Sequence, residues 1–423
     1  MLKGLNINLA LVNLFLGFLG YPLIVLIGTG FGIEESQIVT IPFRYAYLLF
    51  SLLYLAFNVF YFLNKKFNIN FFLFNLFWAL YILRLVYDVY FRDIEANQFS
   101  NNNVILGFAL GVSFLPALNM QYITKNSIER FYKVLFPTLL IICILSIPFA
   151  FKSLEESFRA IGGVGLSTIS YGHYGASLVI ISLFRIVKHK FLGKVLSIAG
   201  VIVGLVIMGL SASKSPFASL AVVLVFYLLS RLSIKRFITI GILLSALLFS
   251  FQVYLSFLVE KGSGFVLRFE RFIESGDALR FQLYNEAVNE FIEHPFLGNQ
   301  FVLENGIGAG IYPHNLVLES FLALGIIGGT LFLFLVGKSI LISYDSIKRL
   351  NSLSWISFLF IQYLVFGMMS GGIYNSNLFW IFLILTLSLA NLKNDNDTTP
   401  EVQLIVIENN ISTKSMSKQK ALN

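Results

Sequence analysis

Long apolar runs recur through almost the whole of this 423-residue chain and limit what it can fold into. A run of about 20 apolar residues lets an α-helix cross the roughly 30 Å of membrane hydrocarbon. Hydrophobic residues make up 57% of the chain and charged residues only 12%, whereas charged residues form about 25% of a typical soluble domain. The mean hydropathy is +0.80. The sequence therefore predicts an all-α, polytopic integral membrane protein.

Twelve apolar segments are candidates for membrane spans, and we expect each to be a helix because lipid cannot satisfy backbone polar groups. The predicted spans are 7–28, 41–63, 70–91, 104–120, 131–151, 168–187, 191–210, 216–230, 237–259, 314–336, 352–371 and 377–392. They form one membrane domain, 1–392, interrupted by a long hydrophilic loop at 260–313. The tail 393–423 is rich in Asn, Asp and Thr, which predicts a disordered cytoplasmic segment.

The positions of Lys and Arg predict the orientation, because short cytoplasmic loops are enriched in these residues. If the N-terminus is cytoplasmic, every short basic loop falls on the cytoplasmic side. These loops carry Lys65, Lys66, Lys125, Arg130, Arg185, Lys188, Lys190, Lys194, Arg231, Lys235, Arg236, Lys338, Lys348 and Arg349. The formal net charge of +8 follows from this placement and needs no nucleic-acid partner. The loop 260–313 then lies outside the cytoplasm.

The loop 260–313 holds the first candidate for chemistry, Arg280. Residues 277–293 place apolar side chains such as Leu283 and Ala287 at helical spacing, which predicts an amphipathic helix near the membrane surface. Arg280 falls in its first turn. The pattern alone leaves two interpretations open, a solvated helix charge and a ligand for an anionic group.

His314 is the candidate base, because it opens the tenth predicted span directly after Pro313. The positive end of a helix dipole disfavours imidazolium, so this histidine should be neutral and able to accept a proton. The same helix end can bind an anion through free N–H groups. The alternative, which the pattern alone favours, is an interfacial histidine with a local hydrogen bond.

Three further cations belong to the outer half of the predicted protein. Arg44 and Arg84 lie inside spans, where an arginine is costly and usually faces a polar cavity. Asp88, one helical turn after Arg84, offers a structural explanation instead, since it can neutralise the charge. Lys214 occupies a short outer turn and could simply snorkel to the interface. Taken with Arg280 and His314, these residues predict a basic outer cavity suited to a phosphate-bearing lipid.

Metal ligation is not expected from the sequence. It contains neither an HExxH nor a CxxC motif, and the single cysteine, Cys143, lies in an apolar run. We therefore predict no metal and no cofactor.

Two sequence elements resemble the bacterial O-antigen polymerase and ligase superfamily. Residues 280–298 (RFQLYNEAVNEFIEHPFLG) resemble its arginine, amphipathic helix and "hPllG" element, and 313–328 resemble its "PHN…LE…GiiG" segment. The turn 211–215 stands where the family often has Ser-Arg-Gly. Here the central residue is Lys214, which keeps the charge but loses the guanidinium fork.

The resemblance implies a metal-independent, GT-C-like glycosyltransferase whose donor is a glycan on undecaprenyl pyrophosphate. It implies that His314 assists attack by an acceptor hydroxyl. By position, it implies that Arg280 and Lys214 bind pyrophosphate. With the other candidates, the residues predicted to bind pyrophosphate or glycan are Arg280, Lys214, Arg84, Arg44, Asn315 and Glu319.

The function expected first is polymerisation of lipid-linked repeat units of O-antigen, capsule or exopolysaccharide by a Wzy-type polymerase. A ligase of the same superfamily, transferring glycan to lipid A core or protein, is the alternative. A lipid-linked-sugar flippase is the alternative from another class. The expected location is the bacterial cytoplasmic (inner) membrane, with the site facing the periplasm. Expected partners are membrane lipids, the lipid-linked oligosaccharide, a chain-length regulator and a flippase.

Overall fold

The computed structural model describes residues 2–62, 68–92, 94, 103–156, 161–163, 166–188, 191–231 and 278–394, and within these ranges the regular elements are helices. The first part of the chain forms α1 (Leu2–Phe15), η1 (Leu16–Gly20), α2 (Tyr21–Gly30), α3 (Ser36–Phe62), α4 (Ile69–Tyr90), α5 (Asn103–Gly107), η2 (Phe108–Phe114), α6 (Leu115–Asn119), η3 (Met120–Tyr122) and α7 (Lys125–Glu156). It continues with α8 (Thr168–Lys188), α9 (Phe191–Leu210), α10 (Lys214–Ser230), α13 (Ala278–Glu293), η4 (Gly306–Gly308), α14 (Leu316–Arg349), α15 (Ser354–Ser370) and α16 (Asn377–Asn394).

Helices stand at eleven of the twelve predicted spans, while the ninth, 237–259, lies outside the described residues. Among the described helices, seven stretches are long and apolar enough to cross a membrane. They are Leu9–Gly30, Ser36–Asn58, Ile69–Tyr90, Val104–Tyr122, Lys125–Ser153, Phe191–Leu210 and Leu316–Arg349. This finding supports a multi-pass membrane protein, and the number twelve remains a prediction. Residues 260–277 of the loop and the tail from 395 also lie outside the described part.

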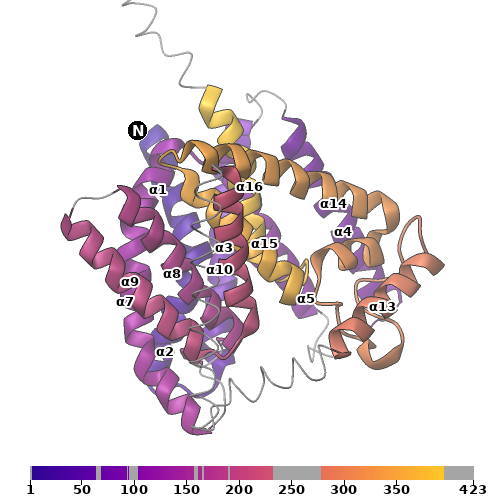
Figure 1. The fold of residues 1–423 in the computed structure, drawn as a ribbon. Helices are drawn as coiled ribbons and strands as arrows, with labels where there is room; N and C mark the ends of the chain where they lie inside the picture. The colour runs from indigo at the N-terminus through magenta and orange to yellow at the C-terminus, as the bar shows by residue number, and fades with distance from the viewer. Residues whose placement is uncertain are drawn as a thin grey trace, which may run out of the picture.

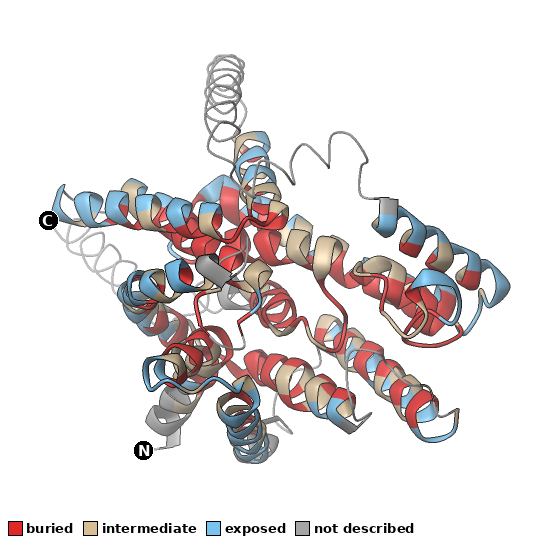
Figure 2. Ribbon diagram, turned by 90° about the horizontal axis from the view of Figure 1, so that it is seen from below, coloured by how far each residue is buried: buried red, intermediate tan, exposed pale blue. Residues whose placement is uncertain are grey.

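The core of the bundle is rich in buried aromatic side chains, and many large hydrophobic side chains are exposed on its outside. Trp78 of α4, Phe332 of α14 and Trp380 of α16 meet at ring distances of 5.1 to 5.9 Å, and all three are fully buried. Figure 2 shows buried residues in red toward the middle of the bundle and exposed residues in blue along its outside. Large hydrophobic side chains such as Leu83 and Phe191 are exposed, as expected where lipid replaces water.

A bend in α14 joins this helix to the segment that follows α13. Gly325 has φ 63° and ψ −158°, so α14 is two helices that meet at this residue. The segment after α13 packs into the bend: Ile326 N–H donates to the Pro295 carbonyl at 2.7 Å, and Asn299 N–H donates to the Leu322 carbonyl at 2.8 Å. The loop thus supplies partners for backbone groups at the broken turn. Figure 1 shows α13 and the bent α14 beside α4, on the opposite side of the bundle from α7, α8 and α9.

Gly325→Ala tests this bend. A Cβ at Gly325 would lie 2.4 Å from the Phe296 carbonyl carbon and oxygen, and its φ is +63°. That backbone region costs a non-glycine residue about 1–3 kcal/mol before any steric overlap. We expect a marked loss of folded protein after graded heating in detergent, measured by size-exclusion chromatography.

The matched control is Gly337→Ala in the same helix, where a Cβ meets nothing within 4 Å. Alanine suits a helix interior better than glycine by about 0.5–1 kcal/mol, so this variant should be as stable as wild type or slightly more stable. Equal stability of the two variants would contradict the close contact between the bend at Gly325 and the segment 295–299.

Candidate functional site

A cavity of about 770 Å³ lies where α2, α3, η2 and α8 face α13, α15 and the chain segments beside them. This volume is in the range of small-molecule and cofactor sites. The ionisable residues lining it are two arginines, two histidines and five tyrosines, with neither Asp nor Glu among the described lining residues. They are Arg44, Arg280, His173, His314, Tyr21, Tyr47, Tyr174, Tyr312 and Tyr363. The cavity is therefore basic and rich in aromatic surface.

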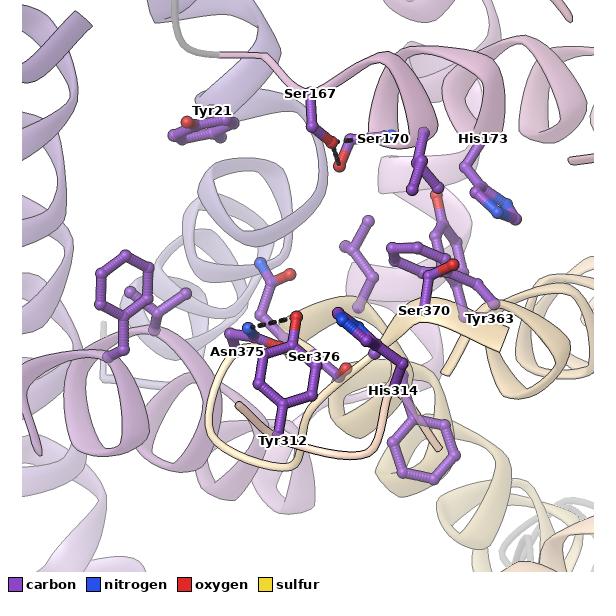
Figure 3. A pocket seen from close by; sticks show the side chains of 18 of the residues that line it. Tyr21, Ser167, Ser170, His173, Tyr312, His314, Tyr363, Ser370, Asn375 and Ser376 are labelled. Atoms are coloured by element: carbon purple, nitrogen blue, oxygen red, sulfur yellow. Dashed lines mark hydrogen bonds between the residues drawn. The ribbon is translucent and has the colours of Figure 1, made fainter. Parts of the chain in front are cut away.

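Arg280 and His314 come together at Ser370, the last residue of α15. Arg280 Nη2 donates to Ser370 Oγ at 3.4 Å, and the Ser370 main chain lies close enough to His314 to influence its pKa. Figure 3 shows the imidazole of His314 and the hydroxyl of Tyr312 pointing into the cavity beside Ser370. Two candidate residues 34 positions apart in the sequence thus share one wall.

The prediction that His314 opens the helix is wrong, because α14 begins at Leu316 with Asn315 as its N-cap. The Asn315 side chain accepts hydrogen bonds from the N–H groups of Val317 (3.0 Å) and Leu318 (3.2 Å). His314 precedes the cap with φ +55°, a left-handed conformation uncommon outside glycine. Asn315 is absent from the described lining residues, and its side chain is occupied by the cap.

The electrostatics of the wall favour a neutral His314. Burial lowers the pKa of His314 below its usual value, and the positive charge of Arg280 lowers the pKa further. The Ser370 main chain opposes these effects. The sequence predicted a neutral His314 because of a helix dipole. In the structure the main cause of its lowered pKa is burial.

Sequence patterns did not indicate four residues of the wall, Tyr312, Gly371, Asn375 and Ser376. The Tyr312 and His314 rings lie 4.4 Å apart in an edge-to-face arrangement, and Asn375 Nδ2 donates to the Tyr312 hydroxyl at 3.5 Å. Tyr312 belongs to the same short motif as His314, so proximity in sequence could have indicated it. Asn375 follows about 60 residues later, and no local pattern connects it to the site.

Arg84 lies apart from the described lining residues and holds the loop instead. It donates to the carbonyls of Leu297 (2.7 Å) and Asn299 (2.9 Å). Asp88 lies 3.6 Å from its guanidinium and accepts from Phe301 N–H at 3.0 Å. The C-terminal end of α4 therefore holds the chain between α13 and His314, in keeping with the structural explanation for Arg84.

Glu319 is also structural in its contacts. The buried carboxylate accepts from the Tyr81 hydroxyl at 2.6 Å and from Ile373 N–H at 2.9 Å. It joins the first turn of α14 to α4 and to the segment that carries Asn375. Like Arg84, Glu319 is absent from the described lining residues.

Lys214 is the first residue of α10 and is not among the described lining residues. The neighbouring Ser215 lies in the first turn, and its hydroxyl pairs with Nε2 of buried His173 at 2.7 Å. The structure therefore ties the turn 211–215 to α8 at the cavity's inner wall.

Two carboxylates of α13 bind main-chain N–H groups in the segment 304–308, which leads to His314. Glu286 accepts from the N–H groups of Ile307 and Gly308, each at 3.2 Å. Glu290 accepts from Glu304 N–H at 2.8 Å, and burial raises its pKa. Within the described part of the chain, no three His, Cys, Asp or Glu side chains gather as a metal site.

This architecture is that of a multi-pass membrane protein with a basic cavity bordered by residues of its hydrophobic core, such as Tyr174 and Tyr363. Residues 199–333 match the family model described as O-antigen ligase, a segment that includes both Arg280 and His314. The match supports the O-antigen polymerase and ligase superfamily, whose members are glycosyltransferase-like enzymes acting on lipid-linked glycans. The resemblance carried by the motifs is confirmed over this segment. No curated protein matches the chain.

The titration of His314 tests the electrostatics of the wall. Diethyl pyrocarbonate reacts with neutral imidazole, so its rate at the His314 peptide, followed by mass spectrometry against pH, gives the midpoint. We expect a midpoint below 6.5. Since Arg280 lowers this pKa, Arg280→Gln should move the midpoint to higher pH. Arg349→Gln, at the far end of α14, is the charge-matched control, and equal shifts in both variants would contradict the assignment.

Proposed function

We propose that the protein polymerises lipid-linked oligosaccharide repeat units by transferring the growing glycan from undecaprenyl pyrophosphate to another unit. The observation that carries the proposal is the meeting of Arg280 and a neutral His314 on the wall of a basic cavity. In this arrangement Arg280 is the cation that stabilises the leaving group, and His314 is the base that accepts the proton of the attacking hydroxyl. We place this cavity on the outer face of a bacterial cytoplasmic membrane.

Arg280 supplies the donor half of the proposed site. Its guanidinium can bind phosphate oxygens through two parallel hydrogen bonds, which a lysine cannot reproduce. Negative charge develops on the pyrophosphate as it leaves, and a cation fixed in a partly dry cavity stabilises that charge most in the transition state. The helix α13 is held by Glu286 and Glu290, so the cation is positioned before the donor binds.

His314 supplies the acceptor half of the reaction. The acceptor hydroxyl oxygen forms a bond to the anomeric carbon of the donor sugar, and the bond from that carbon to the pyrophosphate oxygen breaks. The electron pair of the broken bond stays with the lipid pyrophosphate. The hydroxyl proton passes to the neutral imidazole, which a depressed pKa keeps available near pH 7. All atoms and charges are then accounted for without a metal or cofactor.

Ligation is the second candidate, because the matching family model is described as O-antigen ligase. A ligase would use the same donor half and pass the finished glycan to lipid A core or protein. Transport of the lipid-linked unit is the third outcome that an experiment must separate.

His314→Ala separates these outcomes. Loss of a general base should slow transfer by about 10² to 10⁴-fold while the protein still inserts. Lipid-linked glycans extracted from cells of the native host would be sized by mass spectrometry and gel. Polymerase loss leaves single units on the carrier, ligase loss leaves long polymer on the carrier, and flippase loss leaves single units facing the cytoplasm.

The matched control is His294→Ala, an exposed histidine in the same loop, which should give wild-type glycan. Both variants must be present in membranes at similar levels. Full-length surface glycan from His314→Ala cells would reject the catalytic role.

A further inference from the structure

Arg44 forms a second cationic position in the cavity, on a different wall from Arg280. It belongs to α3, and its guanidinium lies 4.3 Å from the centre of the Phe108 ring and 5.6 Å from that of Tyr21. Arg44 Nη2 also donates to the Tyr21 hydroxyl at 3.5 Å. Two aromatic rings and one hydroxyl thus hold the guanidinium before any ligand binds.

The surroundings of Arg44 lack the group that usually explains an arginine in a membrane span. No carboxylate within the described ranges pairs with it, although Arg84 one helix away pairs with Asp88. Arg44 is half-buried, lies within the candidate span Ser36–Asn58 and lines the cavity. A cation in this position is costly and is retained where it meets an anionic ligand. A guanidinium has five N–H donors, and its contacts with the aromatic rings do not provide hydrogen-bond acceptors for them.

The two arginines belong to different elements and have different partners in the cavity. Arg280 is placed by α13 next to His314 and Ser370, whereas Arg44 is placed by α3 next to Tyr21 and η2. Figure 3 shows Tyr21 across the open part of the cavity from Tyr312 and His314. A donor pyrophosphate held at Arg280 beside the base therefore leaves the position at Arg44 for another anion.

We propose that Arg44, oriented by Tyr21 and Phe108, binds the phosphate of the lipid-linked acceptor and so sets the preference for an acceptor that carries a pyrophosphate. This inference rests on the proposed transfer reaction and adds where its second substrate is anchored. The acceptor's charged end lies at α3 and its free sugar hydroxyl reaches toward His314. Two cations on separate walls thus fix both ends of the reacting pair, which accounts for transfer between two lipid-linked units.

The test uses the purified protein in phosphatidylcholine vesicles, which hold no anionic phospholipid. The donor is a labelled lipid-linked repeat unit from the native host, capped so that it cannot accept. One acceptor is the same unit on its pyrophosphoryl lipid. The other is the unit released by mild acid and joined to an alkyl chain through an uncharged linker. The measured quantity is the ratio of kcat/KM for the two acceptors.

Arg44→Gln should lower this ratio by about ten- to a hundredfold, the loss expected for charge-assisted hydrogen bonds to phosphate. Arg44→Lys should lose part of the preference, and its activity shows that the fold survives. Arg280→Gln is the matched variant on the other wall and should slow transfer to both acceptors by one common factor. An equal loss for both acceptors in Arg44→Gln would overturn the inference.

Two other outcomes have defined meanings. If phosphatidylglycerol added to the vesicles stimulates both acceptors equally, and only when Arg44 is present, the anion at Arg44 is a phospholipid headgroup and the proposal fails. If the wild-type protein transfers glycan to neither acceptor, the proposed reaction itself fails. A falling ratio with intact wild-type transfer supports the acceptor site.

Discussion

The interlock between the bend of α14 and the segment after α13 is the constraint on which the rest of the site depends. Gly298 and Gly325 both have positive φ, and a Cβ on either would strike the backbone of the opposing segment. The glycines let the chain approach close enough for Pro295 and Leu322 carbonyls to accept hydrogen bonds across the contact. This contact holds the segment after α13 against the bend inside α14. Arg280 stands on one of these elements and His314 directly precedes the other.

The proton affinity of His314 is set by its burial and by the positive charge of Arg280. Burial makes imidazolium costly, and a neighbouring guanidinium adds to that cost, so the same arginine proposed to receive phosphate also keeps the histidine neutral. A bound pyrophosphate would partly cancel the charge of Arg280. His314 would then accept a proton more readily once the donor is in place. The proposed donor and base are therefore coupled through a single Coulomb interaction.

Sequence patterns predicted the local features of this protein and missed the long-range ones. Helical spacing gave the amphipathic helix to within one residue of α13, and the short motifs indicated Arg280 and His314. Arg84 and Glu319 were expected at the substrate. The pairing of Arg84 with Asp88 was visible at helical spacing, but the carbonyl partners of Arg84 and the Tyr81 partner of Glu319 lie 213 to 238 residues away, where no periodicity could reveal them. The start of α14 was predicted at His314, directly after Pro313. It lies two residues later because Asn315 is the N-cap residue of the helix. The apolar runs were sufficient to predict a membrane protein. Which candidate residues line the cavity depends on contacts between helices that are distant in the sequence.

Protection of a cysteine at Ser370 tests the central claim most directly, because Arg280 donates to this residue and His314 lines the cavity beside it. Cys143 is the single native cysteine, so Cys143→Ser with Ser370→Cys gives one thiol of nearly native size at the cavity wall. Asn305→Cys, exposed on the outer loop, is the control. A small charged thiosulfonate added outside vesicles should label both. Lipid-linked repeat units should slow labelling at Ser370→Cys and leave Asn305→Cys unchanged, whereas equal rates at Ser370→Cys with and without them would contradict the account.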